Sequence, residues 1–167
     1  GIKETFEIWD VLPEALADEV ATFRSDGFLA ACVTLPHKQN VIPMIDELSD
    51  AAQAIGAVNW IFNKNGKLIG HNTDGTGFIR ALREKVGFNP QGGDATIFGA
   101  GGAARAVSYA LKEAGVKRLT IANRTVERAR ELASYFTEAS FKPEAISMDR
   151  DELADRVPYS NLLVNTT

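Results

Sequence analysis

Short apolar segments alternate with longer amphipathic segments in the second half of the chain. The short segments have the composition of buried strands, and the longer ones repeat apolar residues at helical spacing. We expect strands at residues 95–98, 118–122, 145–148 and 161–165, and helices at residues 103–114, 126–136 and 150–157. Strands that alternate with helices of this length form a parallel sheet with right-handed crossovers. The pattern therefore predicts an α/β fold for this half.

The first half has a less regular pattern. Two apolar stretches flank a predicted turn at Asn63 to Gly66, which predicts a β-hairpin over residues 57–74. Proline, glycine and asparagine cluster in residues 86–95, which indicates a linker. The other expected elements are strands at residues 5–11 and 28–35, and helices at residues 13–24, 41–55 and 75–86.

Composition narrows the class of protein. The chain has 167 residues, of which 45% are hydrophobic, enough for one large domain or two small ones. A net charge of −4 argues against a surface that binds nucleic acid or anionic membranes, and the apolar runs are shorter than a membrane span. The one cysteine, Cys32, is typical of a reducing compartment. We expect a cytoplasmic protein without a nucleic-acid or membrane partner.

The stretch GAGGAAR, residues 99–105, has the spacing of a dinucleotide-binding turn. Gly99 would make the tight turn, Gly101 would let a pyrophosphate approach the backbone, and Ala104 would allow close packing. A predicted strand precedes the turn and a predicted helix follows it, so the helix N-terminus would hold the phosphates. Small residues also pack structural corners, but this context favours dinucleotide binding.

The stretch ANRTVER, residues 122–128, bears on the choice of cofactor. An NAD site usually has a carboxylate at the end of the second strand, but this stretch has Asn123, Arg124, Thr125 and Arg128 around that position. A guanidinium matches the 2′-phosphate of NADP. The alternative is that the arginines only solvate the start of a helix, where the helix dipole does not favour them. The pattern therefore favours NADP.

Lys38 follows a predicted strand that stops at Pro36 in the stretch VTLPHK. Ligand sites in α/β folds lie beyond the carboxyl ends of strands, which is where Lys38 falls if this half is also α/β. A lysine beside an aspartate in a partly closed cleft can act in proton transfer. Asp74, in the stretch NTDG, is the candidate partner. Taken alone, Lys38 could be a surface lysine and Asp74 a helix N-cap.

These motifs together carry a family resemblance. The stretches VTLPHK, IGAVN, GKLIGHNTDGTGF, GAGGAAR and NRTVERA occur here in the order and spacing of the shikimate/quinate dehydrogenase family. The resemblance runs from about Phe6 to the final VNTT. It implies two α/β domains: an N-terminal substrate domain at residues 1–80 and a Rossmann-type parallel-sheet NADP-binding domain at residues 81–167. Since family members extend beyond both ends of this sequence, we expect both domains to be partial here.

The resemblance also implies an activity and the residues that carry it. The activity is the reversible reduction of 3-dehydroshikimate to shikimate with NADPH, in aromatic amino-acid biosynthesis. Lys38 and Asp74 would be the catalytic pair, and Lys38 would exchange a proton with the substrate oxygen. Thr34 and Asn59 would bind substrate hydroxyls together with this pair. The pyrophosphate would lie on Gly99, Ala100, Gly101, Gly102, Ala103 and Ala104, and the 2′-phosphate at Asn123, Arg124, Thr125 and Arg128.

Two residues depart from the family pattern. Cys32 stands where asparagine is usual before VT, and Trp60 where threonine is usual after GAVN. Both positions border the expected substrate, so a dehydrogenase of quinate or another cyclic hydroxy acid, with NADP or NAD, stays an alternative. A catalytically silent NADP-binding module is another, although such a module has no use for Lys38 and Asp74.

We expect no metal site, because His37 and His71 lack a third partner at metal-ligand spacing. The expected partner is the small-molecule substrate. A monomer and a homodimer are both open.

Overall fold

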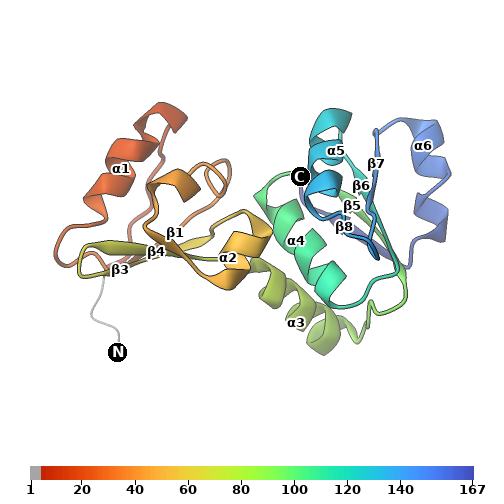
Figure 1. The fold of residues 1–167 in the computed structure, drawn as a ribbon, viewed down its shortest axis with the longest axis horizontal. Coiled ribbons are helices and arrows are strands. Elements are labelled where there is room, and N and C mark those ends of the chain that lie inside the picture. The colour runs from red at the N-terminus through yellow and green to blue at the C-terminus, as the bar shows by residue number, and fades with distance from the viewer. Residues whose placement is uncertain (1–4) are drawn as a thin grey trace.

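The computed structural model describes residues 5–167, which contain two four-stranded sheets. Figure 1 shows the two sheets side by side, with α3 (Asp74–Val86) and α4 (Gly102–Glu113) near the place where the two parts meet. The predicted α/β fold class is confirmed. The predicted boundary between residues 80 and 81 lies inside α3, and the assignment of a substrate domain and a cofactor domain stays a prediction.

The first sheet is mixed, and its strands are β1 (Ala30–Cys32), β2 (Glu47–Leu48), β3 (Trp60–Lys64) and β4 (Lys67–His71). Their order is β1-β3-β4-β2. Strands β3 and β4 form the predicted antiparallel hairpin, whereas β2 is parallel to β4. The turn residues Asn65 and Gly66 have φ values of 55° and 83°, as a type I′ turn requires.

Helix α1 (Leu16–Thr22) packs on this sheet after a 3₁₀ turn at Pro13–Ala15. Its apolar side chains are spaced to face one side, and they are buried against residues of the strands and turns. The buried cluster consists of Leu16, Val20, Phe23, Val33, Val41, Ala52, Val58, Ile61 and Leu68.

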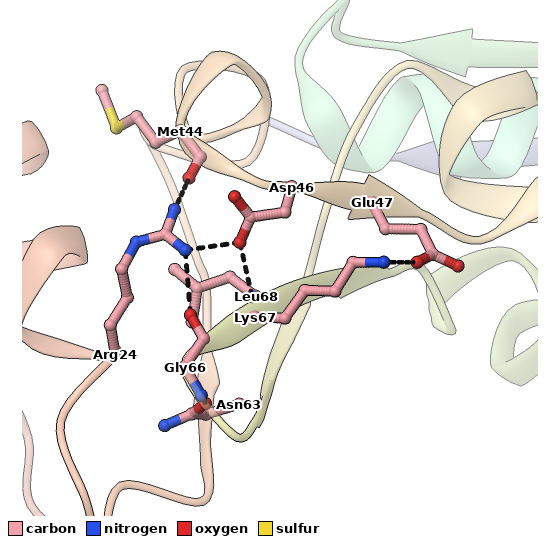
Figure 2. Close-up of polar contacts among 8 residues, drawn as sticks. All are labelled: Arg24, Met44, Asp46, Glu47, Asn63, Gly66, Lys67 and Leu68. Carbon is pink, nitrogen blue, oxygen red and sulfur yellow. Dashed lines mark hydrogen bonds and ion pairs between the residues drawn. The ribbon is translucent and has the colours of Figure 1, made fainter.

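Arg24 joins the end of this helical segment to the hairpin (Figure 2). Its guanidinium donates hydrogen bonds to the carbonyl oxygens of Gly66 at 3.0 Å and Met44 at 3.2 Å, and it forms an ion pair with Asp46. The same Asp46 oxygen accepts the Leu68 amide at 2.7 Å. The hydrogen bond from Arg24, followed by that from Leu68, holds the pKa of Asp46 below its ordinary value. The network fixes the β3–β4 turn against the chain segment that enters β2.

The second sheet is parallel throughout, and its strands are β5 (Asp94–Phe98), β6 (Arg118–Ala122), β7 (Glu144–Ile146) and β8 (Leu162–Asn165). Their order is β7-β6-β5-β8. The prediction of a parallel sheet with intervening helices is therefore confirmed. Because all strands run the same way, their carboxyl ends share one edge of the sheet.

Helices α4 and α5 (Val126–Tyr135) pack against this sheet. Its core is formed by fully buried aliphatic side chains, among them Ile97, Leu111, Leu119, Ile121 and Leu132. Helix α6 (Arg150–Ala154) and a 3₁₀ turn at Val157–Tyr159 connect β7 to β8.

Helix α3 packs directly on α4. Gly75, the second residue of α3, is buried, and a Cβ at this position would lie only 2.8 Å from the carbonyl oxygen of Ala106. Ile55 and Ala57 of the first part are buried together with Ala106. This close contact connects the first sheet region to the helix that follows the glycine turn.

Several predictions for the first half are wrong. No strand forms at residues 5–11, since residues 5–12 have no regular secondary structure. The strand predicted at residues 28–35 is reduced to β1, with three residues. In place of the helix predicted at residues 41–55, the chain forms a 3₁₀ turn at Ile42–Met44, then β2, then α2 (Asp50–Ile55).

Local chemistry explains why the segment at residues 41–55 is divided. Pro43 lies in the 3₁₀ turn, where its missing N–H is tolerated, but it does not support a longer helix. Ser49 has an extended backbone, with φ −64° and ψ 155°, and its side chain accepts the amide of Ala52 at 3.2 Å. Ser49 is therefore an N-cap that starts α2 anew.

Candidate active site

Lys38 and Asp74 come from different elements and meet as an ion pair. Lys38 lies in the turn segment after β1, and Asp74 is the first residue of α3. Lys38 Nζ donates to Asp74 Oδ2 at 2.6 Å. The two side chains are 18% and 28% exposed, so the pair is largely shielded from water but still partly accessible. The structure thus places the two residues of the predicted pair in direct contact.

Asn59 orients the Asp74 carboxylate. Its side-chain amide donates to Asp74 Oδ1 at 2.9 Å and contacts Thr73 Oγ1 at 2.9 Å. Its oxygen accepts the backbone amide of Thr73 at 3.0 Å. Asn59 is only 6% exposed. The residue predicted to bind substrate therefore also fixes the second oxygen of the aspartate.

Asn72 is part of the site and was missed in the sequence. Its Oδ1 accepts the backbone amide of Asp74 at 3.0 Å, and its Nδ2 donates to the carbonyl oxygen of Ala57 at 2.9 Å. The available signal was its position two residues before Asp74, because asparagine side chains often bond to the backbone two residues on. Asn72 anchors the start of α3 to the segment that leads into Asn59.

Asp74 does not act as the N-cap of α3. The N-cap position is Thr73, which makes no side-chain capping bond, and Asp74 is the first helical residue. Its carboxylate oxygens accept hydrogen bonds from Lys38 and Asn59 instead. A carboxylate in the first turn is also favoured by the helix dipole.

Thr34 and Lys38 lie on the same turn. Strand β1 ends at Cys32, before Thr34, so Thr34 is not part of a strand as predicted. The turn is closed by the amide of His37, which donates to the carbonyl oxygen of Thr34 at 2.9 Å. The His37 ring is 8% exposed, and its Nε2 lies 2.7 Å from the carbonyl oxygen of Val11. Thr34 itself is exposed to solvent.

The glycine turn lies at the carboxyl end of β5. Gly99 has a φ of 114°, and a Cβ there would lie 2.5 Å from Thr166 Oγ1, so only glycine fits. Gly101 is the extended N-cap residue of α4, and a Cβ there would meet no atom within 4 Å. The backbone at Gly101 therefore leaves room for a close approach by a pyrophosphate at the N-terminus of α4. Ala104 is fully buried.

Gly102 brings the glycine turn into contact with Lys38. A Cβ on Gly102 would lie 2.8 Å from Cβ and 3.2 Å from Cδ of Lys38. The lysine side chain thus lies across the first residue of α4 and reaches Asp74 from there. The candidate acid–base pair and the candidate phosphate-binding turn are neighbours.

The candidate 2′-phosphate residues follow β6 at the same edge of the sheet. Gly99 donates its amide to the carbonyl oxygen of Ala122 at 2.8 Å, which joins the two loops. The Asn123 side chain donates to the carbonyl oxygen of Thr125 at 2.8 Å. Arg124 and Arg128 are exposed, and within residues 5–167 neither forms an ion pair with a carboxylate. Both guanidiniums are available to an anion.

This arrangement is suited to exchange a proton with a substrate oxygen next to a dinucleotide. The Lys38 ammonium can donate to an oxygen that gains negative charge, while Asp74 keeps it oriented. Within the described residues, the His, Cys, Asp and Glu side chains form no group of three or more that could hold a metal ion. None of the helices in this part of the chain is long and apolar enough to cross a membrane.

Two family models match the chain. The model described as "Shikimate dehydrogenase substrate binding domain" matches residues 1–61, and the model "Shikimate / quinate 5-dehydrogenase" matches residues 81–167. The shikimate dehydrogenase (NADP(+)) of Methanopyrus kandleri is 44% identical over 168 residues, which is 100% of this chain and 58% of the relative. The chain thus spans somewhat more than half the length of this relative.

This chain is also similar to solved structures of shikimate 5-dehydrogenases. Shikimate 5-dehydrogenase from Thermus thermophilus, in complex with NADP(H) and shikimate, has a TM-score of 0.75 and 38% identity, over 95% of this chain and 55% of that one. Shikimate 5-dehydrogenase from Listeria monocytogenes, in complex with shikimate and NAD, has a TM-score of 0.79 and 35% identity, over 97% and 56%.

Proposed function

The chain belongs to the shikimate/quinate dehydrogenase family, and we propose that the protein catalyses the NADP-dependent, reversible reduction of 3-dehydroshikimate to shikimate. The observation that carries this proposal is the Lys38–Asp74 pair at 2.6 Å, with the Lys38 side chain against Gly102 of the glycine turn. A proton donor and a dinucleotide-binding turn at one place are what the reaction needs.

NADPH, when bound, would supply the hydride to the carbonyl carbon of the substrate. The role of the Lys38 ammonium is to donate a proton to the carbonyl oxygen as it gains negative charge, which makes it a hydroxyl. In the reverse direction Lys38 takes this proton back. Asp74 holds the ammonium in place, while Asn59 fixes the carboxylate.

Substrate binding uses the groups around this pair. Thr34, exposed on the turn that carries Lys38, is proposed to bind a substrate hydroxyl. Asn59 and Asp74 are proposed to bind further hydroxyls. The free hydrogen-bonding capacity of an Asp74 carboxylate, which has about four lone-pair sites, supports contacts to both Lys38 and a substrate.

Cofactor binding is proposed on two neighbouring loops. Residues 99–104 would hold the pyrophosphate at the N-terminus of α4, where the open space at Gly101 fits a close approach. Asn123, Arg124, Thr125 and Arg128 would hold the adenosine 2′-phosphate. The exposed guanidiniums of Arg124 and Arg128 support NADP over NAD, because NAD has only a hydroxyl at this point.

The division into a substrate domain at residues 1–80 and a cofactor domain at residues 81–167 is proposed with this function. The two separate sheets and the spans of the two family models support it. A cytoplasmic location is proposed from the single cysteine and the family. The protein is proposed to act as a monomer or homodimer.

The second candidate function is that of a dehydrogenase that prefers quinate or another cyclic hydroxy acid to shikimate. Cys32 and Trp60, the two departures from the family pattern, are direct cross-strand neighbours in β1 and β3. Trp60 also follows Asn59 in the chain. The side chains of these two departures therefore lie next to each other on one face of the sheet.

An assay of the purified protein separates these functions. Formation of reduced cofactor is followed by absorbance with shikimate or quinate, each with NADP or NAD. The proposal predicts the highest kcat/KM for shikimate with NADP. A higher value for quinate would support the second candidate, and no turnover with any pair would contradict both.

A further inference from the structure

The C-terminal end of α2 is held by side chains from the second half of the chain. Helix α2 ends at Ile55 and is followed by the C-cap residue Gly56, whose φ is 68°. The last carbonyl groups of the helix have no partner within it. The Tyr135 hydroxyl donates to the carbonyl oxygen of Gln53 at 3.1 Å. Arg105 Nη1 donates to the carbonyl oxygen of Ile55 at 3.5 Å. Residues of α4 and α5 thus cap a helix of the first half.

Arg105 and Tyr135 also contact each other. The Arg105 guanidinium lies over the Tyr135 ring, 4.4 Å from its centroid, a cation–π distance. Arg105 is half-buried, and this burial lowers the pKa of its guanidinium. A Cβ on Gly56 would lie 2.9 Å from both Arg105 Nη1 and Tyr135 Oη. The pair therefore fits tightly against the helix end, with glycine as the required residue.

The segment after Gly56 leads directly to the acid–base pair. The amide of Val58 donates to the carbonyl oxygen of Lys38 at 2.7 Å. One residue further, the Asn59 side chain donates to Asp74 Oδ1 at 2.9 Å. Val58 and Asn59, two and three residues after Gly56, thus bond to the Lys38 backbone and to the Asp74 carboxylate.

We propose that Arg105 and Tyr135 are positioning residues that set where the Lys38–Asp74 pair lies relative to the glycine turn. Arg105 is in the first turn of α4, three residues after Gly102, so one short helical turn carries both the proposed phosphate site and the cap on α2. The proposal rests on the proposed function. The proposal also excludes Arg105 as a phosphate ligand, because its side chain reaches toward α2 and Tyr135.

The test compares Arg105→Met and Tyr135→Phe with the wild type. Arg130→Met is the matched control, because Arg130 is an exposed arginine of α5 whose ion pair is with Glu127 on the same helix. Measured are kcat and KM for shikimate, the Kd of NADP, and hydrogen exchange at the amides of residues 56–59 in the free protein. Tyr135→Phe removes one hydroxyl from an exposed ring, so it carries the test if Arg105→Met does not fold.

We expect kcat to fall about tenfold in Arg105→Met and about threefold in Tyr135→Phe, since small displacements of catalytic groups reduce rates strongly. The Kd of NADP should stay within about twofold of wild type, because neither variant changes a residue that is proposed to bind the cofactor. Exchange at residues 56–59 should be faster in both variants and unchanged in Arg130→Met.

Three results would overturn the proposal. A raised Kd of NADP with unchanged kcat in Arg105→Met would make Arg105 a phosphate ligand. Unchanged kcat in both variants would mean that the contact does not position the pair. Unchanged exchange at residues 56–59 would mean that it does not hold α2. Because exchange is measured without substrate, it decides this last point even if the wild type fails to oxidise shikimate, a result that would refute the proposed function separately.

Discussion

Replacing Gly102 by alanine tests the contact between the glycine turn and the proposed catalytic lysine. The new Cβ would lie 2.8 Å from Cβ and 3.2 Å from Cδ of Lys38, whereas ordinary contacts begin at 3.4 Å. The lysine or the helix must therefore move by about 0.6 Å. The α4 backbone at this position tolerates alanine, which is a good helix former. The substitution should therefore displace the Lys38 side chain more than it destabilises the fold.

The expected result is a fall in kcat of about tenfold. A misplacement of 1 Å can reduce a rate by about 10²-fold, and a shift of about 0.6 Å, partly absorbed by a flexible side chain, should have a smaller effect. The assay is shikimate oxidation at saturating NADP, together with the Kd of NADP and the melting temperature. The Kd should change less than kcat, because the amides of α4 remain in place.

Two matched glycine variants serve as controls. Gly101→Ala puts a Cβ into open space at the proposed pyrophosphate site, so it should raise the Kd of NADP with little effect on stability. Gly77→Ala adds a methyl group on the exposed face of α3, where nothing lies within 4 Å, and should raise the free energy of unfolding by about 0.5–1 kcal/mol without changing activity. If Gly102→Ala keeps the wild-type kcat and KM, the contact with Lys38 does not matter for catalysis and the reasoning is refuted.

The remaining predictions concern charge. Asp74→Asn should depress kcat but leave the melting temperature almost unchanged; a large loss of stability with full activity would show a structural role instead. Arg124→Ala combined with Arg128→Ala should weaken NADP binding by about two orders of magnitude and change NAD binding little, measured as the two Kd values. Equal losses for both cofactors would contradict the 2′-phosphate assignment. The depressed pKa of Asp46 means that its ion pair with Arg24 stabilises the fold above the ordinary pKa and loses this effect as pH falls through the lowered value. The stability difference between wild type and Asp46→Asn in urea unfolding should therefore shrink at low pH, and a difference independent of pH would contradict this.

The second half of the chain was predictable because its signals are local. Strand β6 matches the predicted residues 118–122, and the parallel pairing followed from the alternation of strands and helices. The glycine turn could be recognised from its spacing. In the first half, the run at residues 41–55 has apolar residues that suit either a helix or a strand. Pro43, the capping by Ser49 and the pairing of β2 with β4 decide between them.

The residues of the candidate site and the pairing of Lys38 with Asp74 were predicted, but the contacts that hold this pair in place were not. Lys38 and Asp74 are 36 residues apart in the chain, and their contact depends on the packing of α3 against α4 through Gly75. The bond from Asn72 to the carbonyl oxygen of Ala57 and the contact of Gly102 with Lys38 are likewise tertiary. These two contacts have no signature in the order of residues along the chain, whereas the family motifs imply Lys38 and Asp74 as a pair.

The most direct test of the proposed function is the rate of NADP reduction by shikimate in the wild type and in Lys38→Ala, with NADP affinity measured in parallel. Loss of the general acid–base group should lower kcat by about 10²-fold or more and leave the Kd of NADP nearly unchanged. If the wild type does not reduce NADP with shikimate, or if Lys38→Ala retains near-normal kcat, the assignment of this site is contradicted.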